Sequence, residues 1–203
     1  MTIASFFTLF ALTTSTALAA SGTDEGISLM YQGKPDEALT QLKPLGDNGD
    51  IKAAFYVSLI LLFGDKTTVT EGMAYLQKAV NAGYGPALDT LAGLYLHGDL
   101  IPRDIHKAKM YYEIASQRGY GSSQFNFGIM SKNGEGVPQD LEDAYVYLSL
   151  AADNYDDLGD LTQDAEKYRN EVRAQLDQDN LDRVHKKYEH LKSEITSKQI
   201  DNS

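Results

Sequence analysis

A helix–turn–helix segment recurs along this chain, and this repetition constrains the fold more than any other feature. The copy at residues 84–119 reads as two helices joined by a short turn. Successive copies end at Gly49, Gly83, Gly119 and Tyr155, which lie 34, 36 and 36 residues apart. A period in this range is typical of repeats in which each helical hairpin packs on its neighbours. The pattern therefore predicts an all-α fold.

Residues at helical spacing indicate the packed faces of the unit. The first helix of residues 84–119 carries small and apolar side chains on one face, namely Ala87, Leu91, Ala92 and Tyr95. The second helix carries Ala108, Tyr111, Tyr112 and Ala115. We expect Gly98 to end the first helix, because glycine adopts positive φ freely. We expect Asp104 to cap the second helix, because its carboxylate can accept backbone N–H groups.

The next copy, residues 120–155, repeats these features. Gly128 stands where Ala92 stands in the preceding copy, and Asp140 stands where Asp104 does. Small residues at such positions allow two helices to approach closely. We therefore expect a helix crossing at Gly128, and we expect Lys132 on the same helix to point outward.

The segment NGEGVPQDLEDAYVYLSLAA, residues 133–152, resembles the Sel1-like repeat, a relative of the tetratricopeptide repeat. The copies at 84–119 and 120–155 match that family's pattern well. The copy at 50–83 lacks the Gly-x-Gly-Val turn, and the first copy reads more like a tetratricopeptide hairpin. The resemblance implies a right-handed α-α superhelix, a solenoid of helical hairpins that serves as a scaffold for protein contacts.

The chain organisation follows from the repeat ends. We expect a signal peptide at residues 1–19, hairpin repeats over 22–155 (22–49, 50–83, 84–119 and 120–155), a helical cap at 156–196, and a frayed tail at 197–203. The cap segment is polar, with apolar residues at helical spacing that mark two helices. A solenoid needs such a polar cap for solubility.

The first residues carry the features of a secretory signal. They are apolar, and they end in Ala17-Leu18-Ala19, an Ala-x-Ala cleavage site. An uncleaved membrane anchor is the alternative, but the threonines of this stretch and the cleavage site favour secretion. No later stretch is apolar enough to span a membrane. The sequence therefore predicts a periplasmic or secreted protein.

Charge and composition narrow the classes of partner. The chain has no cysteine, so it can form no disulfide and no thiolate. Its formal net charge is −11. This charge argues against nucleic acid as a partner, since phosphate binding needs clustered Lys and Arg. It permits a basic protein partner, although solubility alone also explains it.

Tetratricopeptide geometry would place the first helix of each unit on a concave surface. The residues that would line this groove are Phe55, Leu59, Leu62, Asp89, Leu96, His97, Phe125 and Ile129. A strip of this kind suits an amphipathic helix or an extended peptide. The alternative is that these residues only hold the hairpins together.

No pattern of catalytic, cofactor-binding or metal-binding residues was found. The acidic run at 153–166 lacks the ligands of an EF-hand loop, and His185 and His190 are five residues apart rather than three or four. We expect a non-enzymatic protein-interaction module, such as a scaffold or regulator of an envelope complex. One alternative is an immunity-type inhibitor of a secreted toxin. A second is a weak β-lactam-binding enzyme, as implied by cysteine-rich relatives whose paired cysteines are absent here.

Overall fold

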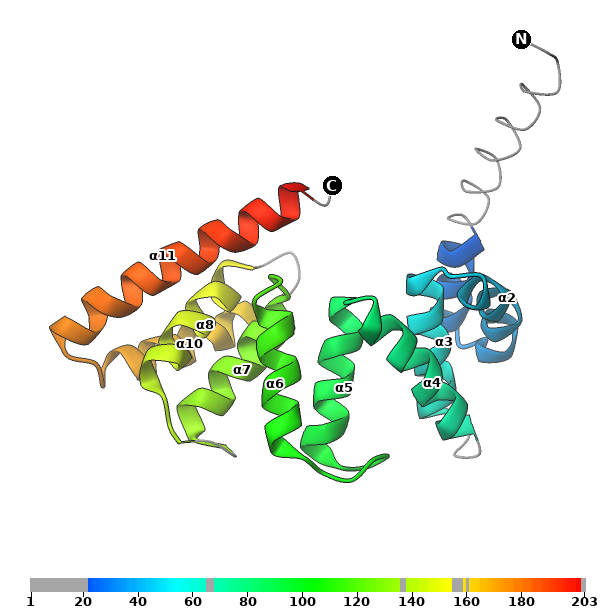
Figure 1. Cartoon of the computed structure of the whole chain (residues 1–203), viewed down its shortest axis with the longest axis horizontal. Helices are drawn as coiled ribbons and strands as arrows, with labels where there is room; N and C mark the ends of the chain where they lie inside the picture. Colours follow the sequence, from blue (N-terminus) through cyan, green and yellow to red (C-terminus); the bar gives the residue numbers. More distant parts are fainter. Residues whose placement is uncertain (1–21, 65–67, 136–137, 155–158, 160, 202–203) are drawn as a thin grey trace, which may run out of the picture. The chain divides into compact units, whose positions relative to one another are not determined.

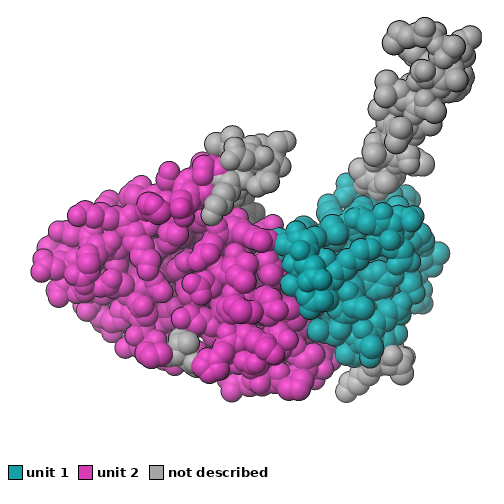
Figure 2. Space-filling model, in the orientation of Figure 1, with its two compact units in different colours: residues 1–87 teal, residues 88–203 magenta. Residues whose placement is uncertain are grey.

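The computed structural model describes the backbone of residues 22–64, 68–135, 138–154, 159 and 161–201. Throughout these ranges the regular structure is helical, and they contain no strand (Figure 1). The all-α prediction is therefore confirmed. The predicted signal peptide lies outside the described residues. The chain divides into two compact units, Met1–Ala87 and Leu88–Ser203 (Figure 2).

The first unit is organised around α3 (Ile51–Phe63), which contacts both α2 (Pro35–Asp47) and α4 (Val69–Asn81). A further helical segment at residues 22–31 precedes α2. Helix α3 is apolar on nearly every side, and such a helix must be covered on more than one face. Its contacts with α2 and α4 provide this cover. The core that it forms with its neighbours contains Ile27, Ala38, Leu42, Ala53, Val57 and Leu61.

The second unit contains the remaining helices. They are α5 (Gly85–His97, which begins at the end of the first unit), α6 (Ile105–Ser116), α7 (Gly121–Asn133), α8 (Leu141–Asp153), α10 (Leu161–Arg173) and α11 (Gln178–Asp201). The two cap helices expected from the sequence are thus present as α10 and α11. Helix α11 continues to Asp201, so the backbone of residues 197–201 is helical where we expected a frayed tail.

Local signals place the helix ends where the sequence predicts them. The carboxylates of Asp50, Asp104 and Asp140 each accept the backbone N–H three residues on, at 2.9, 3.1 and 2.9 Å. Each therefore satisfies one of the N–H groups that a helix start leaves without a partner. Gly98 and Gly134 have φ of +78° and +69°, which side chains with a Cβ rarely adopt. Both glycines stop their helices and let the chain turn.

Aromatic pairs hold the hairpins of the second unit together. The rings of Tyr95 and Tyr111 stack between α5 and α6, with centroids 5.9 Å apart. Phe127 and Tyr147 meet edge to face between α7 and α8, at 4.6 Å. Pairs of this geometry stabilise beyond the area that they bury. The core around them also includes Val184 of α11, so the cap shares the core of the last repeat.

Helices α7 and α8 come together at a glycine. A Cβ on Gly128 would lie 2.8 Å from Cγ of Leu148 and 3.2 Å from the backbone nitrogen of Leu148. The expected helix crossing at Gly128 is therefore confirmed. Helix α8 also contacts α10 and α11, so both cap helices depend on a helix whose position is set by this crossing.

The expectation that Lys132 points outward is wrong. Its Nζ lies 3.0 Å from a carboxylate oxygen of Glu171 and 5.0 Å from the centre of the Tyr168 ring. Both partners belong to α10, and the Lys132 side chain is mostly covered. Repeat periodicity could not predict this contact, because α10 belongs to the cap and follows no repeat register.

We predict that Gly128→Ala lowers the free energy of unfolding. The new Cβ has no room beside Leu148, and overpacking typically costs about 1–3 kcal/mol. Gly93→Ala is the matched control, because a Cβ there would meet nothing closer than the Tyr112 hydroxyl at 3.6 Å. Alanine in a helix interior is favoured over glycine by up to about 1 kcal/mol, so Gly93→Ala should stabilise.

Chemical denaturation followed by circular dichroism measures both variants. Opposite signs for the two changes are expected. Equal effects of Gly128→Ala and Gly93→Ala would mean that the α7–α8 crossing is not as close as described.

Candidate functional site

The structure places the predicted groove residues of the first unit at different depths. Phe55 and Leu62 are buried, while Leu59 is half-buried. The Phe55 ring meets the rings of Tyr56 and Tyr84 edge to face at 5.4 and 5.3 Å. Phe55 and Leu62 therefore act in the core, and Leu59 is the member of this group with a partly accessible side chain.

The predicted groove residues of the second unit also differ from one another. Asp89 accepts a hydrogen bond of 2.6 Å from the Ser123 hydroxyl, which links α5 to α7. Leu96 is half-buried and packs against the core of this unit. His97 is exposed at the last position of α5. His97 and Leu96 are thus available, wholly or in part, to a partner.

Phe125 and Ile129 contact the cap. Both are half-buried and pack against the cluster formed by Ala144, Leu148 and Val172. The Phe125 ring lies 6.1 Å from the ring of Tyr168 on α10. These contacts favour the alternative reading, in which Phe125 and Ile129 hold helices together. Their role in partner binding stays a prediction.

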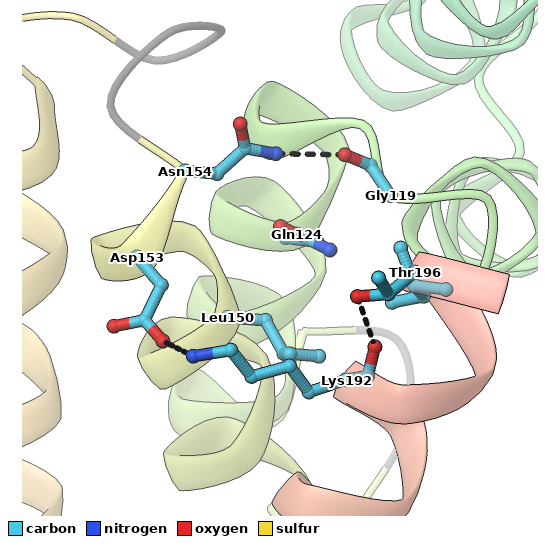
Figure 3. Close-up of a pocket in the computed structure, with 8 residues that line it drawn as sticks. Gly119, Gln124, Leu150, Asp153, Asn154, Lys192 and Thr196 are labelled. Atoms are coloured by element: carbon cyan, nitrogen blue, oxygen red, sulfur yellow. Dashed lines mark hydrogen bonds and ion pairs between the residues drawn. The ribbon is translucent and has the colours of Figure 1, made fainter. Parts of the chain in front are cut away.

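A polar cavity lies within the second unit, between the last hairpin and the cap (Figure 3). Its volume is about 180 Å³. The residues that line it come from the α6–α7 turn, from α7, from the end of α8 and from α11, and they are Gly119, Gln124, Leu150, Asp153, Asn154, Lys192, Ile195 and Thr196. The cavity therefore exists because the cap helix α11 lies beside the last repeat.

Most polar groups around this cavity are already paired. The Asn154 side-chain amide donates to the carbonyl of Gly119 at 2.7 Å, and Thr196 donates to the carbonyl of Lys192 at 2.9 Å. Lys192 forms an ion pair of 2.5 Å with Asp153 (Figure 3). Asp153 also accepts a hydrogen bond from Tyr188. The cavity wall therefore carries one positive and one negative side chain, and their charges cancel because the two are paired.

The Asp153–Lys192 pair keeps both groups ionised. Burial alone would raise the pKa of Asp153, but the hydrogen bonds from Lys192 and Tyr188 outweigh it and hold this pKa below its usual range. The hydrogen bond to Asp153 raises the pKa of Lys192. At neutral pH the cavity thus presents a complete ion pair rather than a free charge.

Gln124 is the exception among these polar groups. It is 2% exposed, and its Nε2 donates to the carbonyl of Ser116 at 3.3 Å, which orients the side-chain amide. Its Oε1 is buried and has no hydrogen-bond partner. An unpaired buried acceptor is uncommon in folded proteins, and each case calls for an explanation.

Sequence reasoning missed this cavity, although the repeat register contains a signal for Gln124. Gln124 lies 36 residues after Leu88, the spacing of the two best copies. Leu88 is buried at 3% exposure and is apolar. The sequence therefore shows a polar residue, Gln124, at the repeat position that an apolar leucine, Leu88, occupies in the preceding copy. The contribution of α11 has no such signal, because the cap does not repeat.

The part of the chain that the structure describes offers no cluster of metal ligands. It contains no group of three or more His, Asp or Glu side chains that could hold a metal ion. Burial raises the pKa of Tyr147 to about 12 and also raises the pKa of Tyr112, so both hydroxyls stay protonated at neutral pH. Within the described part of the chain, no helix combines the length and the apolar character that crossing a membrane requires.

The Sel1 repeat family model matches the chain at residues 51–84, 90–120 and 121–156. The chain belongs to the Sel1 repeat family. The resemblance inferred from the sequence is confirmed, and the matched segments contain the hairpins α3–α4, α5–α6 and α7–α8 in whole or in large part. A search of curated proteins finds no match for this Sel1 repeat chain.

Solved structures show the same fold. One is a crystal structure of a protective antigen of uropathogenic Escherichia coli strains, which displays a Sel1-like repeat fold. It has a TM-score of 0.69 and 19% identity, and the match covers 81% of this chain and 35% of that chain. Another is a Sel1 repeat protein from Oxalobacter formigenes, with a TM-score of 0.50 and 30% identity over 56% of this chain and 34% of that chain. The chain thus covers about a third of the length of either structure.

We predict that Phe125→Ala lowers the thermal midpoint. Truncation of a fully buried Phe costs about 3–5 kcal/mol, and half-buried Phe125 should lose most of that through its contacts with α8 and α10. For a chain of this size we expect a decrease of about 5–10 °C. Phe63→Ala is the matched control, because Phe63 is 65% exposed and should tolerate truncation.

Differential scanning calorimetry of the two variants decides whether Phe125 holds helices together or serves as a partner-binding residue. An unchanged midpoint for Phe125→Ala would restore the groove interpretation, because a binding residue that supports no helix contact can be truncated without cost to the fold.

Proposed function

We propose that this Sel1 repeat chain is a non-enzymatic protein-interaction module of the bacterial envelope, exported to the periplasm or secreted. The observation that carries this proposal is the set of three consecutive Sel1 repeats. Sel1 repeats typically bind other proteins, and proteins of this family typically serve as scaffolds rather than enzymes. The contacts of the described residues agree with this role, since the repeated small and aromatic residues build contacts between helices.

Export is supported by the first residues of the sequence. The apolar stretch ending in Ala17-Leu18-Ala19 has the composition and the small residues that signal peptidase accepts. N-terminal sequencing of protein recovered from the envelope fraction tests this part of the proposal. A chain that starts after Ala19 or Ala20 supports export, whereas an intact Met1 on cytoplasmic protein contradicts it.

We propose that partner contacts involve the predicted groove residues that remain accessible. Leu59 and Leu96 are half-buried, and His97 is exposed. These side chains can meet a partner without loss of the helix contacts that hold the fold. Phe55 and Leu62 are buried, so we do not include them among the partner contacts.

We predict that His97→Ala weakens capture of the partner by about fivefold or more, as expected when an interface anchor is truncated. The thermal midpoint should not change, because His97 is exposed. The experiment is a pull-down from envelope extract with the mature chain as bait, read by mass spectrometry. His190→Ala, which replaces an exposed histidine on α11, is the matched control and should capture as the parent chain does.

The outcomes separate the proposal from its alternatives. A partner whose capture falls with His97→Ala and persists with His190→Ala supports the interaction module. Capture of a secreted toxin would favour the immunity-type inhibitor. Equal capture by both variants would exclude His97 from the interface.

A further inference from the structure

We propose that another pocket of the second unit binds a small monocarboxylate that carries an apolar group. This pocket lies where α10 turns into α11, and α8 contacts both of these helices (Figure 1). It is lined by Tyr145 of α8, by Arg173 at the end of α10 and by five residues of α11. Its volume of about 370 Å³ is near the lower end of the range of ligand pockets, roughly 300–1,000 Å³. The pocket therefore has room for a small ligand.

Basic side chains at this pocket are the first argument. Arg173, His185 and Lys186 line it, and all three are exposed, so a ligand can reach them. Within the part of the chain that the structure describes, neither Arg173 nor Lys186 forms an ion pair with a carboxylate. Two positive charges thus border one pocket and remain available to an anion.

The other basic residues of α11 show the contrast. Arg183, Lys187 and Lys192 each form an ion pair with a carboxylate of α8. These pairs neutralise the side of α11 that lies on α8, whereas the basic side chains at the pocket keep their charge. The chain as a whole has a formal net charge of −11, so most of its surface repels anions. The pocket is therefore a local site at which an anion is attracted.

An acidic residue limits the charge of the ligand. Asp182 also lines the pocket, and it accepts a hydrogen bond of 3.0 Å from Nε2 of Gln178. Its carboxylate repels negative charge, so a dianion such as phosphate gains less from the pocket than a monoanion does. A carboxylate suits Arg173, because the planar guanidinium group can donate two parallel hydrogen bonds to its oxygens.

Apolar side chains beside these charges favour a ligand with an apolar group. Tyr145 and Leu181 line the pocket, and both are half-buried and pack against the core of the second unit. Their positions are therefore held by the core and do not depend on a ligand. An apolar group next to the carboxylate leaves water when it contacts this wall, which stabilises the complex. Acetate and inorganic anions lack such a group.

NMR titrations of the isotope-labelled full chain test the proposal with isocaproate, a branched aliphatic monocarboxylate. We expect saturable shifts of the Leu181, His185 and Lys186 signals. Isocaproamide, which has no charge, should bind about fivefold more weakly, because charge-assisted hydrogen bonds are about twice as strong as neutral ones. Acetate, which lacks the aliphatic group, should bind about tenfold more weakly, because it buries less apolar surface.

Three results would overturn the proposal. Equal binding of isocaproate and isocaproamide would mean that the pocket does not recognise the carboxylate. Inorganic phosphate that binds as tightly as isocaproate would mean a general attraction of anions without a role for the apolar wall. The absence of any saturable shift would mean that the pocket holds solvent only.

Variants test whether the pocket or the net charge attracts the ligand. Arg173→Gln and Lys186→Gln each remove one positive charge from the pocket and should weaken isocaproate binding by about fivefold or more. Lys167→Gln is the matched control, because Lys167 is exposed on α10, lies outside the pocket and changes the net charge equally. All three residues are exposed, so the thermal midpoint should stay close to that of the parent chain. Equal weakening by Lys167→Gln would contradict the assignment of the site.

A further ligand distinguishes a free acid from the end of a peptide. N-acetylleucine carries the carboxylate and the aliphatic group of isocaproate together with a main-chain amide. Tighter binding than that of isocaproate supports a peptide chain end as the natural ligand, and equal or weaker binding supports a free acid.

The inference goes beyond the proposed function, and the two fail separately. The titrations need no protein partner, so a pocket that binds no carboxylate leaves the interaction module intact. A pull-down that captures no partner contradicts the interaction module and leaves the carboxylate site in place.

Discussion

The close crossing of α7 and α8 at Gly128 is the contact on which the second unit depends. A side chain there would meet both the side chain and the backbone of Leu148, so the separation of the two helices is set by the absence of a Cβ. This crossing brings Phe127 and Tyr147 into edge-to-face contact and fixes the face of α8 that receives the cap. The cap helices α10 and α11 both pack on α8, so they depend on the same crossing.

The sequence predicted the parts of the fold that local signals encode. Asp104 and Asp140 cap their helices as expected, and Gly98 and Gly134 adopt the positive φ that ends a helix. These features depend on a few neighbouring residues, and the repeat shows each of them more than once. The prediction of an all-helical repeat followed from the same signals, and the family match confirms it.

The contacts of the cap could not be predicted in this way. Lys132 and Phe125 occupy positions that the repeat pattern leaves open to solvent or to a groove, yet both contact Tyr168 of α10. The cap occurs once and follows no repeat register, so the face that it covers depends on tertiary packing alone. For the same reason the cavity beside α11 was not foreseen, although Gln124 differs visibly from the buried Leu88 of the preceding copy.

The last hairpin and the cap form one packed structure, which contains both the cluster against which Phe125 packs and the polar cavity at Gln124. Hydrogen–deuterium exchange of the full chain tests this most directly, because amide protection reports which helices open together. We expect the amides of α7, α8 and α10 to exchange with one common protection. Exchange of α10 at the rate of an unprotected peptide, while α7 and α8 stay protected, would contradict the account.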